Sequence, residues 1–502
     1  MTLTIPESLI PNRVRRTVHT LCTYERVLPT LLFLAIFLAA ALSPMQNDTW
    51  WQLRAGRDMW RTRHVLLTDY YSHTAYGGFW PNHEWLAEVV FYAIYNVGGL
   101  PLLSLFAASL IVSAWAIVWY LTPGFPRARF VLLACVLPTA AMHWEPRPHA
   151  FSILFVVMTV ALILRHRYAW LPFVFWVWAN CHGGVLLGLV VLAVALTADL
   201  VDGPGRHAGR ALLVVLSCAI AVTLTPLGVS FWTEMVASIG RIHQYPLDEW
   251  QRPLFTDSKQ LLYWLYLGAL CVLLVRHWRA LTAPANRELR VVCATAVGLV
   301  PFSVTAVRGV GLFLMLAIPA IARLWALNQD QVRSVLGNRL AALVGQRTPR
   351  TERHVLNAAL VAIVSLGVAL TLEYAYVNRI QRLRWTPLPP RSIDALRMCP
   401  GNLYNRYDEG GYLVWFAPNH PVFLDGRQDP YPVSLVQQQI AVEHSGDYQR
   451  IFDQHDIGCA YLPTASPVFQ RLVSAGWTPL YEDRDWAVLA RPSHEPRATS
   501  SE

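Results

Sequence analysis

The feature that most limits how this chain can fold is a succession of about eleven apolar runs, each close to the length that crosses a bilayer. Only 15% of the residues are charged, whereas a soluble domain carries about 25%. The sequence therefore predicts a polytopic α-helical membrane protein. Residues 84–97 are apolar but short and aromatic, which favours a re-entrant or interfacial helix. The expected spans are residues 27–45, 100–121, 130–142, 150–164, 169–180, 184–200, 211–225, 260–275, 291–306, 309–327 and 355–374.

Arginines between the runs predict how the chain is oriented in the membrane. If the N-terminus is cytoplasmic, every strongly basic turn lies on the cytoplasmic side, as the positive-inside rule requires. These turns contain Arg127, Arg129, Arg165, Arg167, Arg206, Arg210, Arg276, Arg279, Arg287, Arg290, Arg333, Arg339, Arg347, Arg350 and Arg353. The net charge of +9 therefore does not indicate a nucleic-acid partner. We expect a multi-pass protein of a bacterial inner membrane.

The composition changes after residue 374, where Pro, Gly and charged residues become frequent. In the segment that follows, strands are expected at 411–416, 421–426, 459–463 and 486–491, and helices at 434–444 and 466–475. The orientation puts this α/β domain in the periplasm, where Cys399 and Cys459 could pair. The predicted units are a cytoplasmic N-terminus (1–26), a transmembrane domain (27–374) with a first outer loop (46–99), a linker (375–390), the α/β domain (391–492) and a disordered tail (493–502).

The first outer loop carries charge and tandem tryptophans, so it cannot lie in hydrocarbon. Asp48 stands within a few residues of the end of the first span. A carboxylate at this depth could accept a proton from a hydroxyl group beside a lipid-linked phosphate. Alternatively, Asp48 could be the N-cap of a helix, because Trp51, Ala55 and Met59 have helical spacing.

A second polar group lies in the turn at residues 142–149, MHWEPRPH, on the same predicted side. It contains Glu145, Arg147 and His149 beside apolar runs, and ionisable groups at membrane depth are functional candidates. Arg147 stands between two prolines and suits bidentate binding of a phosphate. The alternative is an ordinary polar turn whose long side chains reach the interface.

Arg308 lies away from the cytoplasmic arginines, which suggests an anionic ligand, or else a salt bridge to Asp248 or Glu249. The segment 424–431, LDGRQDPY, could bind sugar hydroxyls or be a strand that ends in a polar turn. Histidines and carboxylates on this side could also hold a divalent cation such as Mg²⁺ or Mn²⁺, although no spacing is diagnostic. The remaining candidates are His83, Glu84, Asn180 and His182.

Four motifs together resemble the GT-C type of polytopic glycosyltransferase. They are NDTWWQLRAGRDM with TDYYSHTAYGGFWPNHEWLAE, then EPRPHAFS, then WANCHGG, and the C-terminal YNRYDEGGYLVWFAPNHPVFLDGRQDPY. The resemblance is to the bacterial group that is similar to dolichyl-phosphate-mannose-protein mannosyltransferases and lipid A sugar transferases. It implies a polyprenyl-phosphate sugar donor, inversion at the anomeric carbon and an active site in the first outer loop.

By position, the acidic base of that family falls on Asp48. Many relatives carry a second acid beside it, but here the neighbour is Asn47, so a second carboxylate comes from Asp69, Glu84 or Glu145 or is absent. We expect Arg147 and Arg308 to hold the donor phosphate, while His83, Glu84, Glu145, His149 and His182 position the sugar or a glycan, lipid or protein acceptor. The alternative is a non-catalytic scaffold or transporter of polyprenyl-linked glycans. A weaker one is a ligase that transfers whole glycans from a lipid diphosphate.

Overall fold

The computed structural model describes residues 22–200, 204–242, 244, 248–328, 353–378 and 388–492. Most of the predicted N-terminal segment 1–26, most of the linker 375–390 and the whole tail 493–502 lie outside the described residues. Four arginines of the predicted cytoplasmic turns also lie outside them, namely Arg333, Arg339, Arg347 and Arg350.

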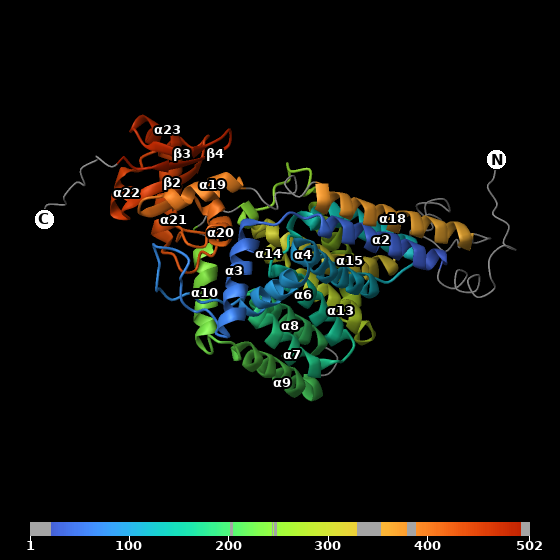
Figure 1. Cartoon of the computed structure of the whole chain (residues 1–502). Coiled ribbons are helices and arrows are strands. Elements are labelled where there is room, and N and C mark those ends of the chain that lie inside the picture. The colour runs from blue at the N-terminus through green and yellow to red at the C-terminus, as the bar shows by residue number, and fades with distance from the viewer. Residues whose placement is uncertain are drawn as a thin grey trace, which may run out of the picture.

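A body of packed helices forms the larger part of the molecule, and a smaller domain lies at one end of it (Figure 1). A helix lies at each of the expected spans, and within the described residues five helices are long and apolar enough to cross a membrane. The long helices of the body are α2 (Tyr24–Ala41), α3 (Asn47–Thr62), α4 (Trp85–Leu121), α5 (Pro126–Ala140), α6 (His149–Leu164), α7 (Leu171–Cys181), α8 (Val185–Leu200), α9 (Pro204–Thr223), α10 (Ser230–Ile242), α11 (Leu261–Arg276), α13 (Arg287–Gly298), α15 (Val307–Ala326) and α18 (His354–Asn378). The short ones are η2 (Ala141–His143), η3 (Tyr168–Trp170), η4 (Asp248–Trp250), α12 (Trp278–Leu281), η5 (Pro284–Asn286) and α14 (Val300–Thr305).

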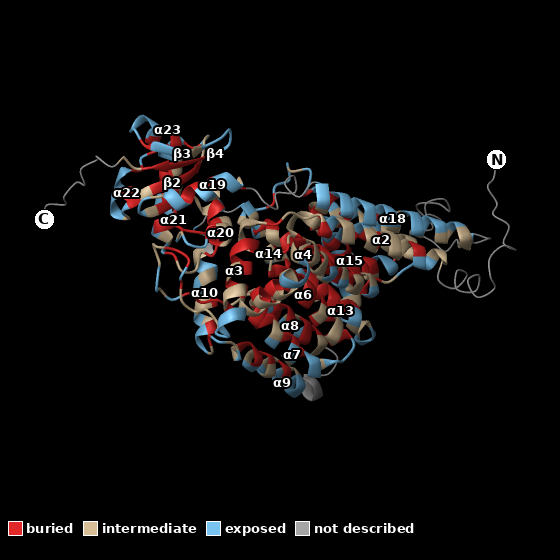
Figure 2. Ribbon diagram, viewed as in Figure 1, coloured by how far each residue is buried: buried red, intermediate tan, exposed pale blue. Residues whose placement is uncertain are grey.

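Apolar side chains occupy both the inside and the outside of this body. Figure 2 shows the buried residues gathered in its centre, whereas α18 and α9 carry much exposed surface. Large apolar residues on these helices, such as Leu212 and Ile363, are more than half exposed. Such a surface suits lipid rather than water, because apolar patches of this extent are rare on soluble monomers. The chain is therefore a helical membrane protein.

Helix α4 is kinked between two segments that were predicted as separate helices, residues 84–97 and 100–121. Its non-helical residues are Gly98 and Gly99, and Gly99 has a φ of 63°, a conformation that favours glycine. Pro101 follows and has no N–H to donate to the preceding turn. The kink thus divides the expected interfacial segment at 84–97, which packs on α3, from the expected span at 100–121.

The C-terminal domain contains one four-stranded sheet in the order β1-β2-β4-β3. Strands β1 and β2 pair in parallel, whereas β4 is antiparallel to both β2 and β3. The expected strands at 459–463 and 486–491 and the helices at 434–444 and 466–475 are confirmed. The elements are α19 (Pro390–Ala395), η6 (Leu396–Met398), β1 (Asn402–Asn405), α20 (Tyr407–Phe416), α21 (Val433–Ser445), α22 (Gln449–Gln454), β2 (Ile457–Pro463), α23 (Pro467–Ser474), β3 (Thr478–Glu482) and β4 (Trp486–Ala490).

Two of the expected strands are wrong. Residues 411–416 belong to α20, which lies between the sheet and α3 (Figure 1), and residues 421–426 form no strand. The apolar run at 411–416 is buried against another helix, with the Phe416 ring 4.7 Å from that of Trp50. Gly411 permits this contact, because a Cβ there would lie 2.3 Å from the backbone oxygen of Asn47.

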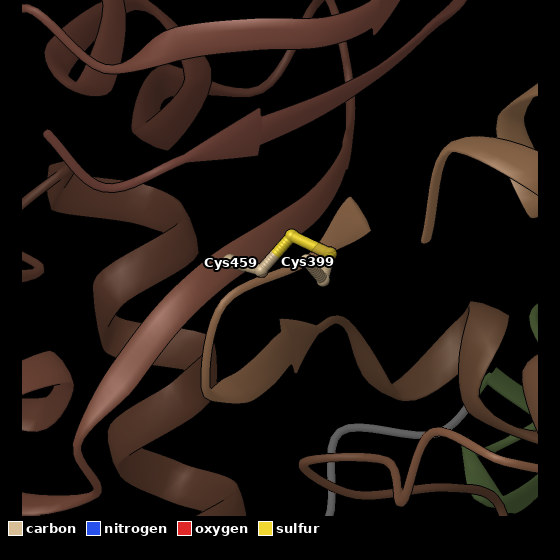
Figure 3. The surroundings of a disulfide bond; sticks show 2 residues. All are labelled: Cys399 and Cys459. Atoms are coloured by element: carbon tan, nitrogen blue, oxygen red, sulfur yellow. A yellow bond between two sulfur atoms is a disulfide. The ribbon is translucent and has the colours of Figure 1, made fainter. Parts of the chain in front are cut away.

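Cys399 and Cys459 form a disulfide (Figure 3). Cys399 directly follows η6, and Cys459 lies in β2, the strand that pairs with both β1 and β4. The bond therefore ties the start of the domain to the middle of its sheet. Disulfides persist in oxidising compartments rather than in the cytosol.

Candidate active site

A cavity of about 500 Å³ lies where the helical body meets the C-terminal domain. Its polar lining comes from α3, residues 80–84, the 143–149 turn, η4 and residues 426–429, while α6, α8 and α15 supply mostly apolar side chains. The predicted site residues that line it are Asp48, His83, Glu84, Arg147, His149, His182 and Arg308. The structure thus brings together predicted residues from five separate parts of the sequence.

Asp48 lies in the first turn of α3 and points into the cavity. The N-cap of this helix is Gln46, whose backbone N–H donates to Thr49 Oγ1 at 3.3 Å, so Asp48 is not the N-cap. Its carboxylate is ion-paired with Arg147 and accepts a hydrogen bond of 3.1 Å from Trp51 Nε1. Burial raises the pKa of Asp48 above its ordinary value, although Arg147 opposes this rise.

Arg147 and Arg308 share a carboxylate partner, Glu249. The distance from Arg308 Nη1 to Glu249 Oε1 is 2.7 Å, and that from Arg147 Nη1 to Glu249 Oε2 is 3.5 Å. Burial raises the pKa of Glu249, but the two arginines outweigh this effect and lower it to about 2. Arg308 therefore has the salt bridge that the sequence offered as an alternative, and it lines the cavity as well.

Of the three residues that the sequence offered as a second carboxylate, Glu84 is the one that lines the cavity with Asp48. It accepts a hydrogen bond of 3.1 Å from Gln52 Nε2, and its Oε1 lies 3.8 Å from His83 Nε2 and 3.7 Å from His182 Nε2. The other ring nitrogen of His182, Nδ1, forms a hydrogen bond of 2.7 Å with Ser152 Oγ. Burial raises the pKa of Glu84, and the nearby His83 and Arg147 oppose this rise.

Two of the candidates have other environments. Glu145 does not line the cavity, and its Oε2 lies 3.8 Å from Nε2 of His149. Asn180 is buried and accepts a hydrogen bond of 2.7 Å from Trp85 Nε1, which links two helices. In the described part of the chain, no group of three or more His, Cys, Asp or Glu residues is arranged to hold a metal ion.

The loop at 424–431, which the sequence offered either for sugar hydroxyls or as a strand that ends in a polar turn, completes the cavity wall through residues 426–429. Gly426 approaches Asp48 so closely that a Cβ would lie 2.1 Å from Asp48 Oδ1. Arg427 is fully buried, with ion pairs of 2.8 Å to Asp425 and 2.7 Å to Asp69. Asp69 therefore binds the C-terminal domain to the first outer loop and does not enter the cavity. The only signal in the sequence was the density of charge beside a glycine in LDGRQDPY.

No protein-family model and no curated protein sequence matches this chain. Among solved structures, it is similar to the oligosaccharyltransferase AglB of Archaeoglobus fulgidus in complex with an inhibitory peptide and a dolichol-phosphate, with 10% identity and a TM-score of 0.56 over 86% of this chain and 69% of that one. The apo form of the Archaeoglobus fulgidus oligosaccharyltransferase gives 12% identity, a TM-score of 0.55 and the same coverage. ArnT of Cupriavidus metallidurans, bound to undecaprenyl phosphate, aligns over 93% of this chain and 98% of its own, with 14% identity and a TM-score of 0.47.

The likeness to the oligosaccharyltransferase confirms the GT-C fold that the sequence motifs implied. The architecture is therefore that of a polytopic GT-C membrane protein with a small C-terminal α/β domain.

Proposed function

We propose that this protein is an inverting glycosyltransferase that moves a sugar from a polyprenyl phosphate to a hydroxyl acceptor on the outer face of the inner membrane. The observation that carries the proposal is that Asp48, Arg147 and Arg308 line one cavity together with apolar side chains. Transfer from a lipid phosphate requires a carboxylate as general base, cationic groups that bind the phosphate, and an apolar wall for the lipid chain. The GT-C fold adds support, because AglB of this fold was solved with a dolichol-phosphate.

The two arginines are suited to the donor phosphate. Both are ion-paired with carboxylates, Arg147 with Asp48 and Glu249, and Arg308 with Glu249. A donor phosphate would take over part of these pairings, because guanidinium groups bind phosphate oxygens in a bidentate manner. Apolar side chains of α6 and α15, including Val156 and Met315, offer a surface for the isoprenoid chain.

Asp48 is placed to act as the general base. When phosphate engages Arg147, the Asp48 carboxylate becomes available to the acceptor hydroxyl, and its raised pKa makes it a stronger base than an ordinary aspartate. The acceptor oxygen forms a bond to the anomeric carbon as its proton passes to Asp48. The bond from that carbon to the phosphate oxygen breaks on the opposite side. Polyprenyl phosphate then leaves with its charge balanced by Arg147 and Arg308.

Location on the outer face is supported by the disulfide in the C-terminal domain, because such bonds are rare in the cytosol. Glu84, His83 and His182 line the same cavity and would orient the sugar or the acceptor. The acceptor is proposed only as a hydroxyl group on a glycan, lipid or protein. No step is assigned to a metal ion.

The test compares glycan and glycolipid profiles by mass spectrometry in the host and in a deletion strain carrying wild-type protein, Asp48→Asn or Asp447→Asn. Asp447 is exposed in the C-terminal domain and provides a matched control. We expect the deletion to lose one sugar, which wild type and Asp447→Asn restore. Loss of a general base slows transfer by roughly 10²- to 10⁴-fold, so Asp48→Asn should not restore the sugar. Full restoration by Asp48→Asn would instead favour the scaffold or transporter.

A further inference from the structure

Asp429 joins the C-terminal domain to the polar wall of the cavity. Its side chain is only 9% exposed, and its Oδ1 accepts hydrogen bonds from Arg241 Nη2 at 2.9 Å and Ser238 Oγ at 3.1 Å. Its Oδ2 lies 3.8 Å from Nδ1 of His83. Asp429, Ser238 and His83 all line the cavity, so this carboxylate faces the space that holds Asp48.

The backbone that presents Asp429 has an unusual conformation. Gln428 has a φ of 61°, in the left-handed region that residues other than glycine rarely adopt. Its side chain donates a hydrogen bond of 2.8 Å to the Tyr407 hydroxyl, while the buried ion pairs of Arg427 fix the residue before it. Backbone strain of this kind persists where the surroundings determine it, and it is concentrated at ligand sites.

The charges around Asp429 favour a neutral hydrogen-bond donor over a cation. Arg241 already balances the carboxylate, so an ammonium group would gain little from it. The His83 ring stands between two carboxylates, with Nδ1 3.8 Å from Asp429 and Nε2 3.8 Å from Glu84. These distances are too long for direct hydrogen bonds. Neighbouring hydroxyl groups of a sugar ring can donate to the two carboxylates and contact the imidazole between them.

We infer that Asp429, His83 and Glu84 form a subsite for sugar hydroxyls, to which the C-terminal domain contributes Asp429. The inference rests on the proposed transferase function and assigns a sugar-binding role to the C-terminal domain. The hydroxyls belong either to the transferred sugar or to a sugar acceptor, because both present the same chemistry.

The test uses the purified full-length protein and measures ligand affinity by microscale thermophoresis. In the donor arm, the probes are undecaprenyl phosphate alone and undecaprenyl phosphate carrying glucose, mannose, galactose, N-acetylglucosamine or an amino sugar. In the acceptor arm, methyl glycosides of the same sugars are titrated with undecaprenyl phosphate at saturation. Wild type is compared with Asp429→Ala, the isosteric Asp429→Asn and the exposed control Asp447→Ala.

We expect a neutral sugar to bind in one arm and Asp429→Ala to weaken that binding by roughly ten- to hundredfold, since a hydrogen bond to a charged group is lost. Asp429→Asn should weaken it less, and undecaprenyl phosphate alone should bind equally well to all four proteins. A merely structural role for Asp429 would reduce the affinity for bare undecaprenyl phosphate as well.

Three further results would overturn the inference. Sugar binding that does not depend on Asp429 in either arm refutes the subsite but leaves the proposed function intact, provided that undecaprenyl phosphate binds. A dependence on Asp429 that is confined to the amino sugar refutes the assignment to neutral hydroxyls. If the wild-type protein does not bind undecaprenyl phosphate, the proposed function is refuted, and so is the subsite, because it rests on that function.

Discussion

Replacing Gly426 by alanine places a methyl group where the general base of the proposed reaction lies. The added Cβ would stand 2.1 Å from Asp48 Oδ1 and 3.0 Å from Asn47 Nδ2. Carbon and oxygen need more than 3 Å, so the Asp48 carboxylate or the loop has to move by about 1 Å. Asp48 has little freedom to do so, because Arg147 and Trp51 hold both of its oxygens. A misplacement of about 1 Å can reduce a rate by roughly 10²-fold.

The matched control is Gly268→Ala in α11, where an added Cβ meets nothing within 4 Å. Both variants are expressed in the deletion strain, and the restored sugar is quantified by mass spectrometry at equal protein levels. We expect Gly268→Ala to restore the wild-type profile and Gly426→Ala to restore a few per cent or less. If Gly426→Ala restores the full profile, the close approach of the C-terminal loop to Asp48 has no role in transfer, and the reasoning is refuted.

Three further predictions concern stability and pH. Arg427→Met removes the ion-pair partner of two buried carboxylates, Asp69 and Asp425. Thermal unfolding of the purified protein should therefore show that its free energy of unfolding falls by about 3–5 kcal/mol. Arg397→Met should change that free energy little, because the Arg397 side chain is 81% exposed. Asp48 must be ionised to act as a base and burial raises its pKa, so the transfer rate should fall on acidification at a higher pH than for an ordinary aspartate; a fall that begins only in the ordinary aspartate range would contradict this. Cys399 and Cys459 are 60 residues apart, so reducing their disulfide should destabilise the C-terminal domain by about 4 kcal/mol. A thermal unfolding curve that is the same with and without reductant would contradict this prediction.

The sequence by itself determined where the apolar helices of the membrane body lie and which of them suit a membrane. Helical periodicity and apolar length are local properties, so the expected spans each lie on a helix and the break before Pro101 lies at two glycines. The sequence also singled out Asp48, Arg147 and Arg308 as candidates, because ionisable residues at the ends of apolar runs are costly to keep at membrane depth. These inferences required no knowledge of how distant segments meet.

Only the tertiary structure decided which of these residues share a cavity and how the C-terminal domain takes part. The apolar run at 411–416 resembled a strand, yet it belongs to helix α20, in which Gly411 permits a close approach to Asn47 of α3. Gly426 and Asp429 became part of the site through contacts with Asp48 and His83, more than 300 residues away in the chain. The contact between Asp69 and Arg427 is equally remote. Such contacts depend on the tertiary packing of the whole chain, and the residue pattern within a short segment does not specify which distant segments will pack together.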